Sequence, residues 1–143
     1  MEQKEITVSL RVYKQQSELD SAETALLNAA RQALPNAYAP YSNFKVGAAV
    51  LLANGKTITG TNQENAAFPV GICAEGTALS AASSLYPDVA VTAIAVTVKS
   101  DKKIIAQPAA PCGICRQRIL EYETRFNKPI KVIMMGEEGE VYV

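Results

Sequence analysis

The hydrophobic positions in the first part of the chain change from a two-residue period to a helical one. Apolar residues occupy every second position of residues 5–12, which is typical of a half-buried strand. Ser17 and Asp20 then resemble a capping box, and an apolar stripe of helical period follows as far as Pro35. The strand's apolar residues are Ile6, Val8, Leu10 and Val12, and those of the stripe are Leu19, Ala22, Leu26, Ala29, Ala30 and Ala33. We therefore expect an N-terminal strand followed by a helix.

Residues 46–60 have the pattern of a β-hairpin. Two β-prone runs flank Asn54 and Gly55, a pair that favours a tight turn matching the twist of the strands. After a polar stretch, a helix is expected to begin near Cys73 and to end before Pro87, because proline removes a backbone donor.

The second half of the chain alternates between strand and helix patterns. We expect a central strand over residues 89–98, a helix from about Gly113 toward Asn127, a strand over 130–135, a turn over 136–139 and a last strand over 140–143. Strands that alternate with helices after a hairpin predict an α/β fold. The expected architecture is a three-layer α/β/α sandwich with a mixed sheet of about five strands.

The length and the charge of the chain predict a single domain that is not strongly attracted to nucleic acid or to a membrane. The 143 residues contain no repeat or low-complexity tract, so we expect one domain over residues 1–143, with residues 1–14 as a possible extra N-terminal strand. Lys and Arg balance Asp and Glu at 14 each, which excludes strong attraction to nucleic acid or to a membrane surface. No apolar run approaches the roughly 20 residues that span a bilayer, and no signal-like leader is present. The expected location is cytoplasmic.

The chain has no histidine and only three cysteines, Cys73, Cys112 and Cys115. An odd number of cysteines does not indicate a disulfide framework. A Cys-x-x-Cys pair alone is equally compatible with a redox pair and with a metal site, and Glu75 beside the third cysteine favours the metal. Three thiolates without a fourth protein ligand leave a position for water, which is typical of catalytic zinc. The pattern therefore predicts a zinc enzyme.

The expected helices help to explain how three thiolates could share one ion. Cys73 lies at the start of one predicted helix, and Cys112 and Cys115 lie at the start of another. The N terminus of a helix carries unpaired N–H groups and a partial positive charge, which stabilise a thiolate. Convergence of two such ends would therefore offset part of the negative charge of the centre.

Four ordered segments resemble the small homotetrameric cytidine deaminases, which depend on zinc. They are residues 38–49 (YAPYSNFKVGAA), 62–69 (NQENAAFP), 71–75 (GICAE) and 111–117 (PCGICRQ). The ordered set is specific, whereas the Cys-x-x-Cys pair alone is not. The resemblance implies hydrolytic deamination of cytidine and 2′-deoxycytidine to the uridine products, with release of ammonia, as in pyrimidine salvage.

The resemblance also implies roles for individual residues. Cys73, Cys112 and Cys115 would hold one zinc ion per subunit, with water as the fourth ligand. Glu75 would take a proton from that water, deliver it to N3 of the ring and later protonate the departing amine.

Further residues match the substrate contacts of these deaminases. Asn62 and Glu64 correspond to a pair that binds the ribose. Phe44 corresponds to an aromatic residue on the pyrimidine, and the backbone of Ala74 to a group that holds the base. Phe68 corresponds to a residue contributed by a neighbouring subunit, so the resemblance implies a homotetramer with shared sites.

Two positions depart from the pattern of these deaminases. Many members with three cysteines have an arginine directly after the glutamate, where it donates hydrogen bonds to ligand sulfurs, and this chain has Gly76. Arg116 is the first candidate to replace it, because it adjoins Cys115, and Arg118 is the second. Relatives also continue into a further tail, whereas this sequence stops at Val143, so the C-terminal tail is expected to be absent.

Other functions remain open at this point. A deaminase-fold zinc protein with impaired activity would bind the metal without turnover. A deaminase of another cytosine nucleoside, such as blasticidin S, would share the metal site, although Asn62 and Glu64 disfavour it. A thiol-redox protein would instead form a Cys112–Cys115 disulfide. The neutral charge disfavours an enzyme that edits polynucleotides.

Overall fold

The computed structural model describes all residues from Met1 to Val143. Its helices and strands are β1 (Val12–Tyr13), α1 (Ser21–Ala33), β2 (Phe44–Leu52), β3 (Thr57–Thr61), α2 (Ala74–Leu85), β4 (Val91–Ser100), α3 (Gly113–Phe126), β5 (Lys131–Met135) and β6 (Val141–Tyr142). Three short 3-10 turns, Gln16–Glu18, Leu34–Asn36 and Phe68–Val70, lie between them.

The strands form one six-stranded sheet in the order β1-β6-β5-β4-β2-β3. The β4–β5 pair is parallel and is connected through α3, whereas every other neighbouring pair is antiparallel. The mixed sheet and the α/β class confirm the prediction. The sheet has six strands rather than about five because β1 and β6, of two residues each, pair at its edge.

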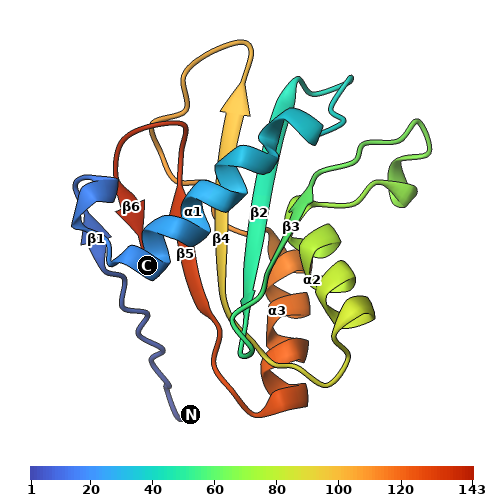
Figure 1. The fold of residues 1–143 in the computed structure, drawn as a ribbon. Helices are drawn as coiled ribbons and strands as arrows, with labels where there is room; N and C mark the ends of the chain where they lie inside the picture. The colour runs from blue at the N-terminus through green and yellow to red at the C-terminus, as the bar shows by residue number, and fades with distance from the viewer.

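Helices cover both faces of the sheet, which gives the expected three layers (Figure 1). Successive side chains of a strand point to opposite faces, and β2 shows this directly. Ala49 packs with α1 on one face, whereas Ala48 and Val50 pack with α2 on the other. The α1 layer includes Leu26, Leu27, Ala30, Ala95 and Ile133, and the α2–α3 layer includes Ala74, Ala78, Leu79, Val96 and Ile119.

Gly60 allows α2 to approach the sheet closely. A Cβ atom at this position in β3 would overlap the backbone nitrogen of Ala78 and would lie 2.7 Å from the carbonyl oxygen of Ala74. The backbone of α2 therefore packs directly on β3, and this contact sets the position of the first turn of α2 on the sheet. The first turn of α2 carries residues of the predicted metal site.

Helix α1 begins at Ser21, after the N-cap residue Asp20, and not at the Ser17 end of the predicted capping box. Asp20 caps the helix: its Oδ1 accepts a hydrogen bond from the Glu23 N–H at 2.7 Å, and Glu23 Oε2 accepts one from the Asp20 N–H. Ser17 lies in the preceding 3-10 turn and does not begin the helix. The predicted hairpin is confirmed, with Leu51 paired to Thr57.

The N-terminal strand expected over residues 5–12 is wrong except at its end. Strand β1 spans only Val12–Tyr13, the backbone pairing extends one residue further to Arg11 and Val143, and the side chains of Ile6 and Val8 are exposed rather than half-buried. The reason is that β1 lies at the sheet edge and pairs with β6, which spans only two residues. The segment before Arg11 therefore has no neighbouring strand to bind.

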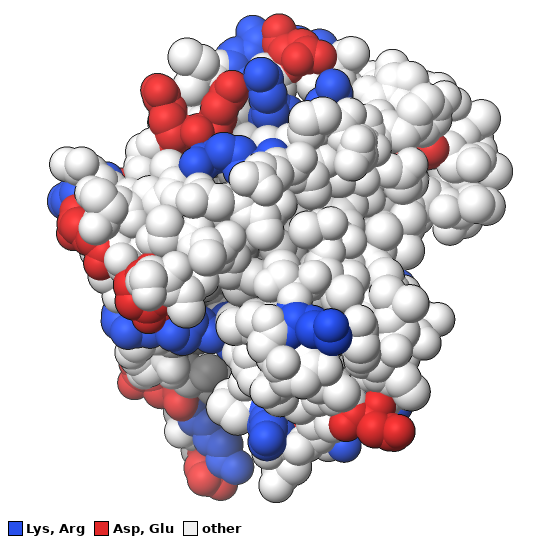
Figure 2. All heavy atoms as spheres, viewed as in Figure 1, with Lys and Arg blue, Asp and Glu red and all other residues white.

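Charges of both signs are mixed on the face of the molecule that Figure 2 shows. Figure 2 shows basic and acidic atoms interspersed on one face, with no broad area of a single sign. None of the helices combines the length and apolar character needed to cross a membrane.

Candidate active site

A pocket of about 850 Å³ opens where four parts of the chain meet. Its wall is formed by the start of β2, the segment from β3 to α2, and the first turns of α2 and α3. The volume lies within the range of sites that enclose a small molecule. Of the predicted site residues, Phe44, Asn62, Glu64, Phe68, Cys73, Ala74, Glu75 and Cys112 line the pocket, and Cys115 lies behind its wall.

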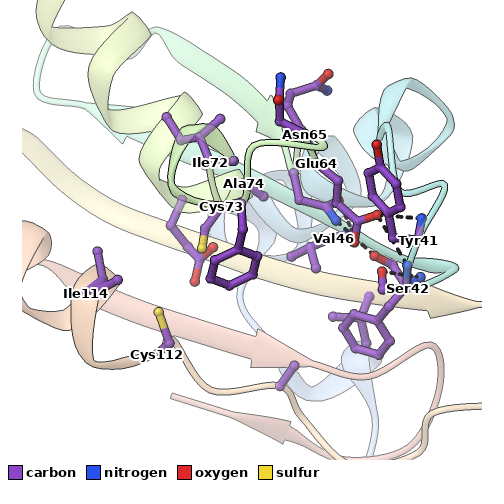
Figure 3. Close-up of a pocket in the computed structure, with 18 of the residues that line it drawn as sticks. Tyr41, Ser42, Val46, Glu64, Asn65, Ile72, Cys73, Ala74, Cys112 and Ile114 are labelled. Carbon is purple, nitrogen blue, oxygen red and sulfur yellow. Dashed lines mark hydrogen bonds between the residues drawn. The ribbon is translucent and has the colours of Figure 1, made fainter.

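The three cysteines meet at one end of this pocket. Cys73 is the N-cap of α2, Cys112 is the N-cap of α3, and Cys115 lies in the first turn of α3. Their sulfur atoms all lie within 4.8 Å of one another. That separation suits a single ion with Zn–S bonds of about 2.3 Å. Cys73 and Cys112 point their sulfurs into the pocket from the two helices (Figure 3), whereas Cys115 is buried.

Contacts between α2 and α3 hold this arrangement. The Tyr122 hydroxyl donates a hydrogen bond to the Leu79 carbonyl at 2.9 Å. The Arg125 guanidinium donates to the Ser83 hydroxyl at 3.0 Å and to the Pro87 carbonyl at 2.6 Å. These bonds join the helices beyond their first turns, and the two N termini therefore converge on the sulfur cluster.

The surroundings of the three thiols differ, and their pKa values differ accordingly. At Cys112, hydrogen bonds from the backbone N–H groups of Cys115 and Ile114 favour the thiolate and lower the pKa. Burial raises the pKa of Cys115 strongly, and the negative charge of Glu75 adds to this. Burial also raises the pKa of Cys73. One helix N terminus therefore stabilises one thiolate, and the other two require a cation, which a bound zinc ion supplies.

Glu75 lies beside the cysteines in the first turn of α2. It is only 6% exposed, it lines the pocket, and its carboxylate makes no hydrogen bond with another protein group. Because its oxygen atoms are not fully enclosed, they open onto the pocket. Such a group is consequently available to bond a ligand or a water molecule in the pocket.

Asn62 and Glu64 lie in the segment that follows β3. The Asn62 side chain bonds the start of β2 in both directions: the Val46 N–H donates to its Oδ1 at 2.8 Å, and its Nδ2 donates to the Phe44 carbonyl at 2.9 Å. Asn62 therefore acts first as a clamp between this segment and β2.

Glu64 is held at the pocket wall by the turn that precedes β2. Its Oε2 accepts hydrogen bonds from the backbone N–H groups of Tyr41 at 2.9 Å and Ser42 at 3.3 Å (Figure 3). Hydrogen bonding from Ser42 is the main reason that the pKa of Glu64 is lowered, and the Tyr41 N–H adds to it. Glu64 Oε1 has no protein partner. The sequence did not predict the role of the Tyr41 and Ser42 backbone groups. Every residue except proline has a backbone N–H, so the residue type does not show which of them bonds a side chain.

The aromatic residues occupy different parts of the pocket. Phe44 is half-buried in its wall, at the first residue of β2. Phe68 lies on the short 3-10 turn at the mouth and is 91% exposed. Ala74, at the start of α2, is fully buried and contributes to the pocket lining.

Arg118, and not Arg116, lies next to Gly76. A Cβ atom at Gly76 would overlap Nη1 of Arg118, whereas Arg116 is exposed. Arg118 is therefore the better placed of the two candidates. Residues three apart share a helix face and adjacent residues do not, so Arg118 lies on the face of Cys115. The spacing could have indicated this.

A three-cysteine cluster beside a carboxylate that faces the pocket is the arrangement of a zinc hydrolase. Comparisons with known proteins identify the family. The cytidine and deoxycytidylate deaminase zinc-binding region matches residues 20–128. The chain is 44% identical over 118 residues to the cytidine deaminase of Halalkalibacterium halodurans, covering 82% of this chain and 85% of the relative. It is 40% identical over 116 residues to that of Sporosarcina psychrophila, covering 81% and 79%.

Solved structures agree with these relatives. The crystal structure of cytidine deaminase from Burkholderia pseudomallei matches with a TM-score of 0.68 and 41% identity over 83% of this chain and 89% of that one. That of Mycobacterium leprae matches with a TM-score of 0.64 and 32% identity, covering 85% and 92%. The chain therefore belongs to the cytidine and deoxycytidylate deaminase family, and zinc is its cofactor.

Proposed function

We propose that this protein catalyses the hydrolytic deamination of cytidine and 2′-deoxycytidine to uridine and 2′-deoxyuridine, with release of ammonia. The observation that carries the proposal is a single pocket that contains both the Cys73–Cys112–Cys115 metal centre with Glu75 and the polar pair Asn62 and Glu64. The relatives named as cytidine deaminases support the same reaction.

The chemistry at the cysteine end depends on proton transfer by Glu75. Zinc held by the three cysteines supplies Lewis acidity and lowers the pKa of water in its vicinity. Glu75 lies beside this centre and has no competing protein partner. Its carboxylate takes a proton from the water that attacks C4 and delivers it to N3 of the ring. It then moves the second proton to the amine, which leaves as ammonia while the C4–N bond breaks.

The other end of the pocket holds the sugar. Glu64 is kept ionised by its hydrogen bonds and has Oε1 free to accept from a ribose hydroxyl. Asn62 retains one N–H of its amide after donating to the Phe44 carbonyl. Phe44 packs on the pyrimidine, and the backbone of Ala74 holds the base against the metal centre.

The charge of the pocket favours a free nucleoside over a nucleotide. The only charged side chains that line it are those of Glu64 and Glu75, and no lysine or arginine is among its residues. A 5′-phosphate carries up to two negative charges and normally requires arginine, lysine or a helix N terminus. The two helix N termini in the pocket wall already face the cysteine cluster. We therefore infer that deoxycytidylate is excluded, although the family includes enzymes that use it.

We further propose that the protein assembles into a homotetramer with sites shared between subunits and acts in pyrimidine salvage in the cytoplasm. Apolar side chains surround the mouth of the pocket and are exposed in the single chain, which is typical of a surface covered by another protein. They are Tyr41, Phe68 and Ile114, and Val70 is exposed on the same 3-10 turn as Phe68.

The test is an absorbance assay on zinc-loaded protein with cytidine, 2′-deoxycytidine, deoxycytidylate and blasticidin S as separate substrates. We expect turnover of the two nucleosides and none of the nucleotide. Absence of uridine from a sample with one zinc per chain would reject the proposed reaction. Preferential turnover of deoxycytidylate would reject the argument from pocket charge.

A further inference from the structure

Gly76 occupies a restricted position between α2 and α3. It is buried, and it directly follows Glu75 in the first turn of α2. A Cβ atom at this position would overlap Nη1 of Arg118, would lie 3.2 Å from its Cζ, and would lie 3.1 Å from Cγ1 of Ile72. The space that a side chain at position 76 would fill is thus occupied by the guanidinium group of Arg118.

We propose that Arg118 is a positioning residue that offsets the negative charge of the three cysteine thiolates, and that Gly76 is the residue that admits it. Each of the two residues lies one helical turn beyond a cysteine: Gly76 three residues after Cys73, and Arg118 three residues after Cys115. Residues spaced in this way share one face of a helix. Both therefore lie on the side of the helix that carries the sulfur cluster.

The direction of the Arg118 side chain brings its charge toward the cluster. Side chains of an α-helix lean toward the helix N terminus, and the N terminus of α3 is where Cys112 and Cys115 lie. The guanidinium of Arg118 contacts Gly76 in the first turn of α2, adjacent to Glu75. It therefore lies between the two helices, against the first turn of α2.

Arg118 makes no hydrogen bond with another protein group, unlike Arg125, and its side chain is half-buried, unlike that of Arg116. Arg125 donates to Ser83 and Pro87, and Arg116 extends into solvent. Arg118 is half-buried, so a substantial part of its charge is not screened by water. Its donors remain available for the sulfur atoms or for Glu75.

The charge of the metal centre explains why such a group is needed. Three thiolates on Zn²⁺ leave one net negative charge, and the nearby Glu75 adds a second. A hydrogen-bond donor outside the ligands withdraws electron density from the sulfurs and strengthens the site, and loss of such a group typically costs 10- to 100-fold in metal affinity. The chain has glycine instead of arginine after Glu75, and the guanidinium of Arg118 in α3 supplies the positive charge in its place.

The experiment compares Arg118→Met and Arg118→Lys with the wild type and with Arg116→Met as the matched control. Zinc affinity is measured by competition with a chromophoric chelator, and the thiolate-to-metal charge-transfer band is recorded on Co²⁺-substituted protein. We expect Arg118→Met to lose about 10- to 100-fold in zinc affinity and to shift the Co²⁺ band to lower energy. Arg118→Lys should retain affinity within about threefold, and Arg116→Met should be unchanged.

Equal affinity and an unshifted band in Arg118→Met would overturn the proposal, as would equal losses in the Met and Lys variants. If Arg118→Met does not fold, Gly76→Ala provides the second test, since its methyl group displaces a guanidinium that is still present. Wild-type zinc affinity and an unshifted band in folded Gly76→Ala would also overturn it. The catalytic relevance of Arg118 rests on the proposed function, but metal affinity is measured without a nucleoside. A wild type that binds zinc without turnover would therefore refute only the proposed reaction.

Discussion

Cys73 and Cys112 occupy the same structural position on two different helices. Each is the N-cap residue, one of α2 and one of α3, and their sulfur atoms lie within 4.8 Å of each other and of Cys115. A metal ion bound here therefore cross-links two segments that are distant in sequence and that meet only in the folded chain. Stability and metal binding are coupled by this arrangement.

Removal of the metal should consequently destabilise the protein. A ligand present at a thousandfold excess over its Kd stabilises the folded state by about 4 kcal/mol, which corresponds to roughly 10–20 °C in the unfolding midpoint of a chain of this length. We expect chelator treatment to lower the midpoint by this amount and added Zn²⁺ to restore it, as measured by calorimetry. Cys112→Ser should have the low midpoint with or without zinc. A midpoint unaffected by chelation of all zinc would contradict the coupling.

Glu75→Gln should separate metal binding from turnover. The amide has nearly the same shape as the carboxylate but cannot accept and return a proton, and general acid–base catalysis typically contributes 10²- to 10⁴-fold. We expect kcat for cytidine to fall within or beyond that range while zinc stoichiometry stays at one per chain. Glu121→Gln, on the exposed side of α3, serves as the matched control. Turnover within a few-fold of the wild type would remove the proton-transfer role of Glu75.

Glu64→Gln should affect substrate binding more than the chemical step. A hydrogen bond to a charged acceptor typically contributes about 1.5–3 kcal/mol, so KM for cytidine should rise about 10- to 100-fold with a smaller change in kcat. A fall confined to kcat would place Glu64 in the chemical step instead. Glu18→Gln, an exposed carboxylate outside the pocket, is the control.

The lowered pKa of Glu64 predicts how KM for cytidine depends on pH. Hydrogen bonds from Ser42 and from the Tyr41 N–H favour the carboxylate in the folded protein. The stability it contributes is therefore complete above the pKa of the unfolded chain and is lost as pH falls through the lower folded value. We expect KM of the wild type to be constant down to roughly pH 4, provided that the metal centre remains loaded. A rise in KM between pH 6 and pH 5, with zinc retained, would contradict the hydrogen-bonded carboxylate.

Asn62→Ala tests the clamp between β2 and the segment that carries Glu64. The substitution leaves the Val46 N–H and the Phe44 carbonyl without their partners. An unsatisfied group of this kind costs about 1–3 kcal/mol. We expect a loss of that size in the free energy of unfolding, measured in urea, together with a raised KM. Asn65→Ala is the control, because Asn65 is exposed and its Oδ1 accepts only from the Ala67 N–H. Equal stability of the two variants would exclude the clamp.

The parts of the fold and site that follow from local sequence could be predicted, and the parts that depend on packing could not. The helices and the hairpin follow from hydrophobic period and turn chemistry, and the three cysteines with Glu75 follow from short motifs at helix starts. The strand expected at residues 5–12 has the right period but no partner before Arg11, because β6 is too short to pair with more of it. The helical spacing places Arg118 on the face of Cys115, but its contact with Gly76 depends on how α2 packs against α3 and is seen only in the structure.

Phe68→Glu should prevent the proposed sharing of sites between subunits. Phe68 is 91% exposed at the pocket mouth, where a single chain gains nothing from an apolar ring, and a charge there would be buried if another subunit covered it. We expect light scattering to show dissociation of the tetramer and the assay to show loss of most activity, while far-UV circular dichroism remains unchanged. Ile6→Glu is the matched control, since Ile6 is equally exposed but lies away from the pocket. If Phe68→Glu stays tetrameric and active, the ring does not lie in a subunit contact and each site is built from one chain.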